Sequence, residues 1–431
     1  MRNYAIGRTR LAILIAGMVL GAAPAGAATL SLQRVAGPGD IANPVHAAAP
    51  VGDTERLFML DRASGDIKIY NRATGLVSAT PFLTVAGLGD EGEQGAYALA
   101  FAPDYATSGK FYVSIGNAAG DHQVVEYTRS ADPNIADPAS ARVVITVPHP
   151  ADGAPSHYGG WIGFGPDGYL YVTTGDSNAD PIDNAAQVKS NLLGSVLRID
   201  PSTDAFPGDS QNNFSVPADN PFLGDDPADD AVWAYGLRNP FRAAFDPASG
   251  AFFIADVGED RMEEINLGAA GANYGWPGYE GSLSFLPAEL DGAPVTFPIF
   301  EYPHEAGPDG RRSITGGEFY QGPLDSLDGF YFFGDFLTGE VWSFLYDAAS
   351  GTISDIIAWE LALDEGVLNT LVSFARDGDG NLYILDITGG VWLVADAEIP
   401  APAGLPLMIA GLASLWGWRR KRARALVSAS R

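Results

Sequence analysis

The sequence predicts an all-β fold, a six-bladed β-propeller, from three observations. Within its 431 residues, a short unit occurs six times: a β-branched or aromatic run, a Gly/Asp turn and a second apolar run. The chain also contains 52 glycines and 30 prolines, which favour turns between short strands. No segment of the central region shows sustained helical periodicity over a useful length.

The first copy of the unit is the clearest. Arg56–Asp61 turns through Ser64–Asp66 into Ile67–Tyr70. The other five copies start with the predicted strands Lys110–Ser114, Gly168–Thr173, Ala251–Asp256, Gly329–Asp335 and Asn381–Asp386. One such unit cannot bury both of its faces, so neighbouring units are expected to stack around one axis as blades of a single domain.

The spacing of the copies predicts where loops are inserted. Copies three to five are separated by 83 and 78 residues, whereas the other intervals are 52 to 58 residues. We therefore expect insertions in the third and fourth intervals, on the binding face of the propeller. The early segment Leu30–Val35 is expected to supply a strand that closes the ring against the last blade.

Residues 1–27 are predicted to be a secretory signal peptide. Arg2, Arg8 and Arg10 precede the apolar run Leu11–Leu20, and small residues follow up to Ala27. This order of basic, apolar and small residues is typical of such peptides. A buried N-terminal helix is the alternative. The globular domain is then expected to span residues 28–398.

Residues 399–431 are predicted to be a C-terminal sorting tail. The sequence from Ile399 to Ala403 precedes the apolar stretch Gly404–Trp418 and the basic cluster Arg419–Arg424. This order resembles PEP-CTERM sorting signals, closest to the VPLPA variant, although Ala401 stands where that motif has Leu. The resemblance implies export to the periplasm or cell surface and processing by an exosortase-type membrane protease. A plain membrane anchor is the alternative.

The two ends hide the acidity of the central domain. The whole chain has 25 basic and 53 acidic residues, a formal charge of −28. Residues 1–27 and 403–431 hold nine of the basic residues and no acidic ones, so the remainder carries −37. Such a charge argues against nucleic-acid partners, which need a basic surface. The absence of cysteine excludes disulfides, thiolate metal sites and a cysteine nucleophile.

Seven segments in order resemble the glucose/sorbosone dehydrogenase family. They span the described repeats and comprise Glu91–Ile115, His157–Gly168, Leu192–Asp200, Trp233–Pro240, Asp256–Asn266, Asn273–Pro277 and Ser313–Gly317. The resemblance implies a six-bladed propeller that oxidises an aldose or a related sugar. Quinoprotein members of the family use pyrroloquinoline quinone (PQQ) as electron acceptor, together with calcium.

A proton acceptor is the first chemical requirement of sugar oxidation. Histidine suits this role near neutral pH when a carboxylate orients its ring. Of the five histidines, only His157 stands beside a Gly-Gly pair that would let a ligand approach the backbone. By resemblance, His157 is the catalytic base and Asp176, nineteen residues later, orients it. A structural role for His157 is the alternative.

The resemblance also implies cofactor contacts. Arg238 and Asn239 match an Arg-Asn pair beside the quinone, where a guanidinium stabilises negative charge. Gly258 and Glu259 match the pair whose main-chain carbonyls hold calcium. Arg312 is a candidate substitute for the basic residues that relatives supply from later blades, as are Arg311 and Arg376. A structural role for Arg238, between blades, stays open.

Two departures from the family keep other functions open. No lysine lies between residues 190 and 402, although PQQ enzymes use one from a later blade. The family's glutamine after the Asp176 position has only Gln187 as a distant candidate. The alternatives are a non-catalytic propeller that binds an extracellular polysaccharide or protein, and a calcium-dependent lactonase or hydrolase. The segment Asp377–Asn381 has calcium-loop spacing but is predicted to be a hairpin turn.

Overall fold

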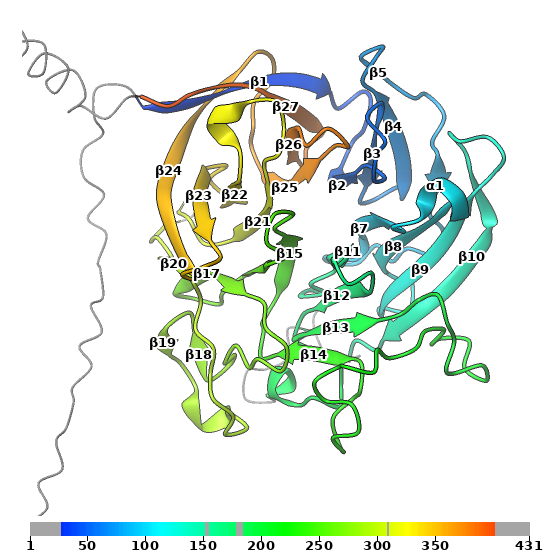
Figure 1. Ribbon diagram of the computed structural model, residues 1–431, viewed down its shortest axis with the longest axis vertical. Coiled ribbons are helices and arrows are strands. Elements are labelled where there is room, and N and C mark those ends of the chain that lie inside the picture. Colours follow the sequence, from blue (N-terminus) through cyan, green and yellow to red (C-terminus); the bar gives the residue numbers. More distant parts are fainter. Residues whose placement is uncertain (1–26, 151–154, 178–183, 308–309, 401–431) are drawn as a thin grey trace, which may run out of the picture. The chain divides into compact units, whose positions relative to one another are not determined.

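Each of the six sequence repeats forms a β-strand in the computed structural model, and the strands belong to sheets arranged around a central axis (Figure 1). The structure describes residues 27–150, 155–177, 184–307 and 310–400. The six strands are β3 (Arg56–Asp61), β8 (Lys110–Gly116), β12 (Leu170–Thr174), β16 (Phe252–Asp256), β22 (Phe330–Asp335) and β26 (Leu382–Asp386). Nearly all of their residues are buried, because both faces of each sheet are covered.

Four sheets consist of strands that follow one another in the chain and pair antiparallel. The first contains β3 with β2 (Pro44–Ala48), β4 (Asp66–Asn71), β5 (Leu76–Val77) and β6 (Leu83–Thr84). The second contains β8 with β7 (Gly95–Phe101), β9 (His122–Arg129) and β10 (Ala136–Val147). The third contains β12 with β11 (Ile162–Phe164), β13 (Ser195–Ile199) and β14 (Val232–Tyr235). The fourth contains β16 with β15 (Pro240–Phe245), β17 (Met262–Leu267) and β20 (Phe300–Pro303).

The remaining repeats share one eight-stranded sheet. Its strands, in spatial order, are β21 (Ile314–Phe319), β22, β23 (Val341–Asp347), β24 (Thr352–Leu363), β1 (Ala28–Ala36), β27 (Gly390–Glu398), β26 and β25 (Leu371–Arg376). A small hairpin inserted before β20 contains β18 (Tyr279–Glu280) and β19 (Leu283–Ser284). The described helices are one turn each: α1 (Tyr105–Ser108), η2 (Ala185–Gln187), η3 (Pro287–Glu289) and η4 (Asp325–Leu327). The fold is therefore all-β and propeller-like.

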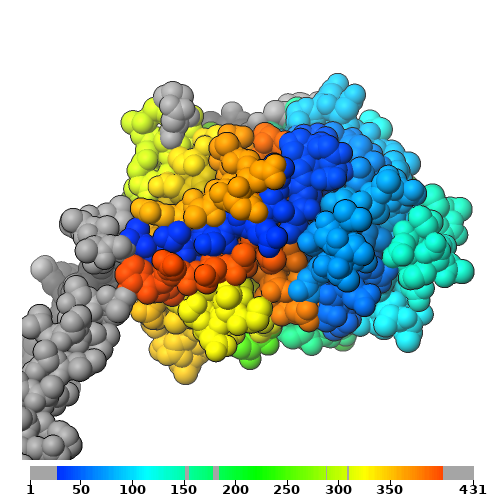
Figure 2. All heavy atoms as spheres, turned by 90° about the horizontal axis from the view of Figure 1, so that it is seen from above, coloured from blue at the N-terminus to red at the C-terminus, as the bar shows by residue number. Residues whose placement is uncertain are grey.

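The first strand joins the two halves of this large sheet. β1 pairs antiparallel with β27, with Leu30 opposite Ala397, which confirms the expected closure against the last repeat. β1 also pairs in parallel with β24, where Leu30 lies opposite Leu361, a contact that the sequence did not suggest. Figure 2 shows β1 as a blue band between β27 in red-orange and β24 in light orange. The start and the end of the domain are thus held by one set of ladder hydrogen bonds.

A buried aspartate closes four of the repeats in the same way. In the first, Asp61 Oδ2 accepts hydrogen bonds from the backbone N–H groups of Ala42 and Asn43, at 3.1 and 2.8 Å. The equivalent aspartates, each at the end of the repeat strand and each bonded to the two residues before the innermost strand, are Asp256, Asp335 and Asp386. These bonds satisfy backbone donors that the ladder leaves unpaired, so the aspartates fix how each sheet begins.

Aromatic side chains fill the space between neighbouring sheets. Phe253 of β16 lies against Phe319 and Tyr331 of the next sheet, with ring centroids 5.2 and 5.1 Å apart. All three side chains are almost fully buried. Burying each such ring stabilises the fold by roughly 1.5–3 kcal/mol. The stacking of sheets that the repeats predicted is therefore carried by aromatic contacts.

The sequence-predicted terminal segments fall almost wholly outside the described residues. Ala28–Glu398 forms one compact unit. In the part of the chain that the structure describes, no helix has the length and apolar character needed to span a membrane. The signal peptide and the sorting tail stay predictions.

Candidate active site

The His157 segment forms a loop before β11 with an uncommon backbone. His157 has a φ of 55°, and Gly159 and Gly160 have φ values of 64° and 90°. A Cβ on Gly160 would lie 2.7 Å from the ring of Tyr97, and one on Gly175 would lie 1.9 Å from the carbonyl oxygen of His157. The glycines therefore let the loop pack against β7 and the end of β12. This packing fixes the backbone of His157 in a left-handed conformation that is unfavourable in isolation.

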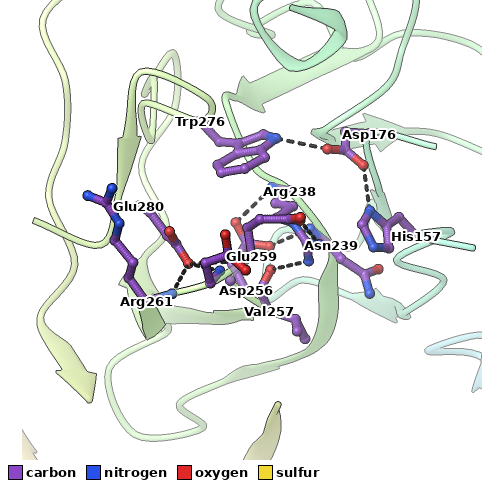
Figure 3. A network of polar contacts seen from close by, with 12 residues as sticks. His157, Asp176, Arg238, Asn239, Asp256, Val257, Glu259, Arg261, Trp276 and Glu280 are labelled. Atoms are coloured by element: carbon purple, nitrogen blue, oxygen red, sulfur yellow. Dashed lines mark hydrogen bonds and ion pairs between the residues drawn. The ribbon is translucent and has the colours of Figure 1, made fainter. Parts of the chain in front are cut away.

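The side chain of His157 is held by Asp176, as Figure 3 shows. Its Nδ1 lies 2.8 Å from Asp176 Oδ1, and the other carboxylate oxygen accepts a 2.8 Å hydrogen bond from Trp276 Nε1. The backbone N–H of Asp176 donates to the carbonyl oxygen of Arg238 at 2.8 Å. Because a carboxylate accepts, the hydrogen of the neutral ring is on Nδ1, and the lone pair is then on Nε2. Among the described residues, Nε2 has no hydrogen-bond partner.

Asn239 ties this loop to the neighbouring sheet. Its side-chain oxygen accepts a 3.0 Å hydrogen bond from the backbone N–H of Gly159. Its own backbone N–H and that of Arg238 donate to the buried Asp256, at 2.6 and 2.8 Å. The aspartate that closes the fourth repeat therefore also positions the Arg-Asn pair beside His157.

The guanidinium of Arg238 is occupied by protein groups on one side. It forms an ion pair with Glu259, donates to the carbonyl oxygen of Val257 at 3.0 Å and lies 5.6 Å from the centre of the Trp276 ring. Its Nε is buried and has no hydrogen-bond partner within the described part of the chain. Three of the five N–H donors of Arg238, Nε–H among them, thus have no partner among the described residues.

The predicted calcium pair lies in a tight loop after β16. A Cβ on Gly258 would lie 1.8 Å from the carbonyl oxygen of Met262, so only glycine fits there. One oxygen of Glu280 accepts the backbone N–H groups of four consecutive residues, starting with Glu259 at 2.7 Å. No group of three or more His, Asp or Glu suited to a metal occurs among the described residues. The predicted ligands are main-chain carbonyls, which that finding does not address.

Two buried carboxyls beneath this loop repel each other. Burial raises the pKa of Asp256 to about 7, against the hydrogen bonds from Arg238 and Asn239 that lower it. Burial, and then the neighbouring Asp256, raises the pKa of Glu264 well above its usual value. Removing a carboxylate from water disfavours its charged form, and a second carboxylate nearby adds to the effect. A buried proton is therefore retained here at pH values where exposed carboxyls are ionised.

A cavity of about 220 Å³ lies beside the His157 loop. Its wall includes residues from the innermost strands of several sheets and the two residues that follow His157 in the loop. The lining residues are Val45, Arg62, Gly92, Glu93, Tyr97, Tyr158, Gly159, Asn239, Phe241, Val257, Ser313, Ile314, Thr315, Phe336, Val372 and Ile387. We call it the upper cavity. Arg62 is its one cationic lining residue among those described, and Glu93 is its one carboxylate. The hydroxyl of Tyr97 is buried there without a hydrogen-bond partner in the described chain.

None of the other candidates is among the residues that line this cavity. Arg312 lies in the loop before β21, and its side chain is not part of the wall. Arg376 donates to Gln321 at 2.9 Å, elsewhere on the axis. Gln187 is buried and donates to Asn273 at 2.9 Å, so it braces a loop. The segment from Asp377 to Asn381 forms the turn between β25 and β26.

Three residues near the site were not singled out from the sequence. Asp256 and Trp276 lie within motifs that carried the resemblance, but nothing in those motifs showed which atoms they contact. Glu93 accepts the backbone N–H of His157 at 2.8 Å from 64 residues earlier in the chain. His304 also contacts a carboxylate, Glu263, at 2.6 Å, but this glutamate also accepts the Ile314 N–H, which makes the pair a brace between sheets.

The profile of the glucose/sorbosone dehydrogenase family matches residues 42–352, which is most of the described domain. The chain belongs to the glucose/sorbosone dehydrogenase family. The match includes both the His157–Asp176 pair and the Arg238–Asn239 turn. The resemblance in the sequence motifs is thereby confirmed at the level of the family.

The individual proteins that this chain resembles carry different names. The chain is 36% identical over 306 residues to HIPL1 protein of Arabidopsis thaliana, covering 62% of this chain and 43% of that protein. It is 29% identical over 224 residues to aldose sugar dehydrogenase YliI of Escherichia coli, covering 51% of this chain and 55% of the relative. The chain thus spans about half the length of these relatives.

A solved structure of similar fold is the PQQ-bound form of aldose sugar dehydrogenase from Streptomyces coelicolor. The TM-score is 0.65 at 23% identity, and the alignment covers 88% of this chain and all of that one. At this identity the similarity establishes the fold. It supports the propeller-like arrangement of the sheets.

Proposed function

We propose that the protein is an exported sugar dehydrogenase that oxidises a hydroxyl of an aldose or a related sugar. The observation that carries the proposal is the fixed chain of contacts from His157 through Asp176 to Trp276. Family membership and the name of the Escherichia coli relative support the substrate class.

The protein's part in this reaction is the movement of one proton. His157 Nε2 accepts the proton of the sugar hydroxyl while a hydride leaves the carbon that bears this hydroxyl. The ring then carries a positive charge, which Asp176 stabilises through the 2.8 Å hydrogen bond at Nδ1. Trp276 holds the carboxylate in place, so the ring does not need to reorient during the transfer.

The residues at the upper cavity fit a polar acceptor such as PQQ. The hydroxyl of the lining residue Tyr97 is buried and has no hydrogen-bond partner among the described residues, and neither has Arg238 Nε, next in the chain to the lining residue Asn239. Together with Arg62 and Asn239 in the wall, these groups would hold the cofactor. When bound, PQQ supplies the site that accepts the hydride and its two electrons. The PQQ-bound relative supports this cofactor.

Calcium belongs to the same proposal. The main-chain carbonyl groups of Gly258 and Glu259 would hold the ion. Two buried oxygens of this region, Glu280 Oε2 and Asn266 Oδ1, have no hydrogen-bond partner within the described chain. Hard oxygen donors of this kind suit calcium.

We also propose six blades and an exported location. The eight-stranded sheet divides at the β1–β24 contact into two four-stranded blades. Contacts between innermost strands support this count, since β2 lies beside β7 and β25, and β21 beside β15 and β25. The basic and apolar ends of the sequence support export, with membrane attachment or exosortase-type processing of the tail. Fractionation of the producing cells with a tail-deleted control tests the location.

A reconstitution experiment tests the enzymatic proposal. PQQ and Ca²⁺ are added to the purified full-length protein, and dye reduction is followed with a panel of aldoses. We expect dye reduction with at least one aldose, dependent on both additions. His157→Ala is expected to abolish turnover while leaving the absorbance of bound PQQ largely unchanged. Absence of both PQQ binding and dye reduction would refute the proposal.

One observation favours a second function, a non-catalytic propeller that binds an extracellular polysaccharide or protein. PQQ carries three carboxylates, whereas the described wall of the upper cavity offers the single cation Arg62, offset by Glu93. Burying carboxylates without counter-charges is costly. The same PQQ titration separates the two functions, because the binding propeller predicts no spectral change.

A further inference from the structure

The central axis contains a second cavity, which is independent of His157. Val45 and Phe241 of two innermost strands line the upper cavity. The next residues in the chain, His46 and Arg242, line the second one. This second space, the lower cavity, has a volume of about 490 Å³. Its most buried charged and polar lining residues are Arg242, Asp377 and His46, which are 2%, 5% and 8% exposed. The volume is in the range of small-molecule sites, about 300–1,000 Å³.

Arg242 is a buried cation whose partners are all neutral. Its Nε donates to Ser373 Oγ at 3.0 Å, and its two other nitrogens donate to the carbonyl oxygens of Phe241 and Val45 at 2.9 and 2.6 Å. Two of its five N–H donors remain. No carboxylate among the described residues forms an ion pair with it. Burial lowers its pKa to about 9, so the guanidinium is charged at neutral pH.

Arg198, a second arginine buried within a sheet, has the counter-ions that Arg242 lacks. Arg198 has a side chain that is 6% exposed and pairs with Asp167 and Asp219, at 2.9 and 2.7 Å. A buried charge without a counter-ion costs several kcal/mol. Arg242 bears that cost at the bottom of a cavity that has room for an anion.

His46 adds a second donor to the same space. Its Nδ1 accepts the backbone N–H of Leu99 at 3.3 Å, so in the neutral ring the hydrogen is on Nε2. Burial, and then the charge of Arg242, lowers the pKa of His46 well below its usual value, which keeps the ring neutral. Nε2 has no hydrogen-bond partner among the described residues and is not sealed from the cavity.

The remaining charges around the lower cavity compensate one another. Asp377 pairs with Arg72 at 3.0 Å and accepts further hydrogen bonds from its own turn. Glu318 lies 3.9 Å from Arg376. Arg242 is therefore left as the uncompensated charge of the cavity, accompanied by a histidine that donates.

We infer that the lower cavity is a binding site for a small carboxylate, held by the free N–H groups of Arg242 and by His46 Nε2. A guanidinium matches the two oxygens of a carboxylate better than it matches a spherical ion. The carboxylate supplies the missing negative charge and the missing acceptors. The site does not depend on the enzymatic proposal, because no residue lines both cavities.

Acetate is the probe for this site. Sodium acetate is titrated by calorimetry into the full-length protein in a zwitterionic buffer, with acetamide as the neutral analogue and sodium chloride as the spherical anion. We expect saturable binding of one acetate, no binding of acetamide and weaker binding of chloride. Arg242→Gln is expected to weaken acetate binding by about 10–100-fold, the value of a charge-assisted hydrogen bond.

Arg198→Gln is the matched control, since it removes a buried arginine that already has carboxylate partners. Its acetate affinity should equal that of the unaltered protein. If Arg242→Gln does not fold, a crystal structure of the unaltered protein grown with acetate tests the site instead. Acetate bonded to Arg242 supports the site. An empty cavity at saturating acetate, equal binding of chloride, or unchanged affinity in Arg242→Gln overturns it.

Discussion

Replacing Asp176 by asparagine should move the ring hydrogen of His157 from Nδ1 to Nε2. In the unaltered protein, the donors to the Asp176 carboxylate include His157 Nδ1 and Trp276 Nε1, at 2.8 Å each. Asparagine has one acceptor oxygen, and the indole N–H can only donate. If the amide oxygen keeps the Trp276 bond, the amide NH₂ faces His157 Nδ1. That nitrogen must then accept, so the ring hydrogen moves to Nε2 and the base is blocked.

The expected fall in kcat follows from the loss of the general base. General-base catalysis contributes about 10²- to 10⁴-fold to a rate, which is about 3–5 kcal/mol of barrier. Asp176→Asn removes the base and the charge that stabilises the protonated ring, so kcat should fall by about this factor. Stability should change less, by about 1–3 kcal/mol, because one charge-assisted hydrogen bond is lost at a nearly isosteric site.

Three measurements test this reasoning. The reconstituted protein is assayed by dye reduction, nitrogen NMR reports which ring nitrogen of His157 carries the hydrogen, and urea unfolding reports stability. The control is Asp386→Asn, at the end of the last repeat strand, where the carboxylate holds Asn369 and Thr370. This control should lose stability without changing the His157 tautomer. An Asp176→Asn protein that keeps the tautomer and at least half of its activity contradicts the account.

Two further predictions concern stability. Because burial and Asp256 raise the pKa of Glu264, the folded protein holds a proton that the unfolded chain releases above about pH 4, so stability falls as the pH rises from there. Glu264→Gln, measured by urea unfolding in EDTA, should therefore gain about 1 kcal/mol or more relative to the unaltered protein between pH 4 and pH 7; an equal difference at both pH values contradicts this. A Cβ on Gly317 would lie 1.4 Å from the carbonyl oxygen of Phe332, so Gly317→Ala should cost about 3 kcal/mol or more. Gly208→Ala, with open space around it, should leave the unfolding midpoint unchanged, and equal midpoints for both variants would refute the packing argument.

The strands were predictable because each repeat carries its own local signal. Strands buried on both faces need continuous apolar runs, and Gly or Asp ends them, so six copies could be recognised without any tertiary contact. The pairing of Leu30–Val35 with the last repeat followed from the need to close a ring. The parallel β1–β24 contact did not, because it depends on how far β24 extends past β23.

The site was predictable only where the family motif fixed it. His157 and Asp176 came from the resemblance, and the structure brings them into contact. Arg238 was expected beside a cofactor, but its ion pair with Glu259 depends on a loop geometry that spacing cannot encode. Arg242 carries no local mark at all: it stands in the run Phe241–Phe245, and only the closed ring shows that it has no counter-ion.

The most direct test of the central claim is hydride transfer in the reconstituted protein. The aldose that reduces the dye fastest is prepared with deuterium at the reacting carbon, and reduction of the PQQ- and Ca²⁺-loaded full-length protein is followed by stopped flow. The account predicts slower reduction with the deuterated sugar, and no reduction of the loaded His157→Ala variant with either sugar. Equal rates for His157→Ala and the unaltered protein, or no reduction by any aldose despite bound PQQ, would contradict it.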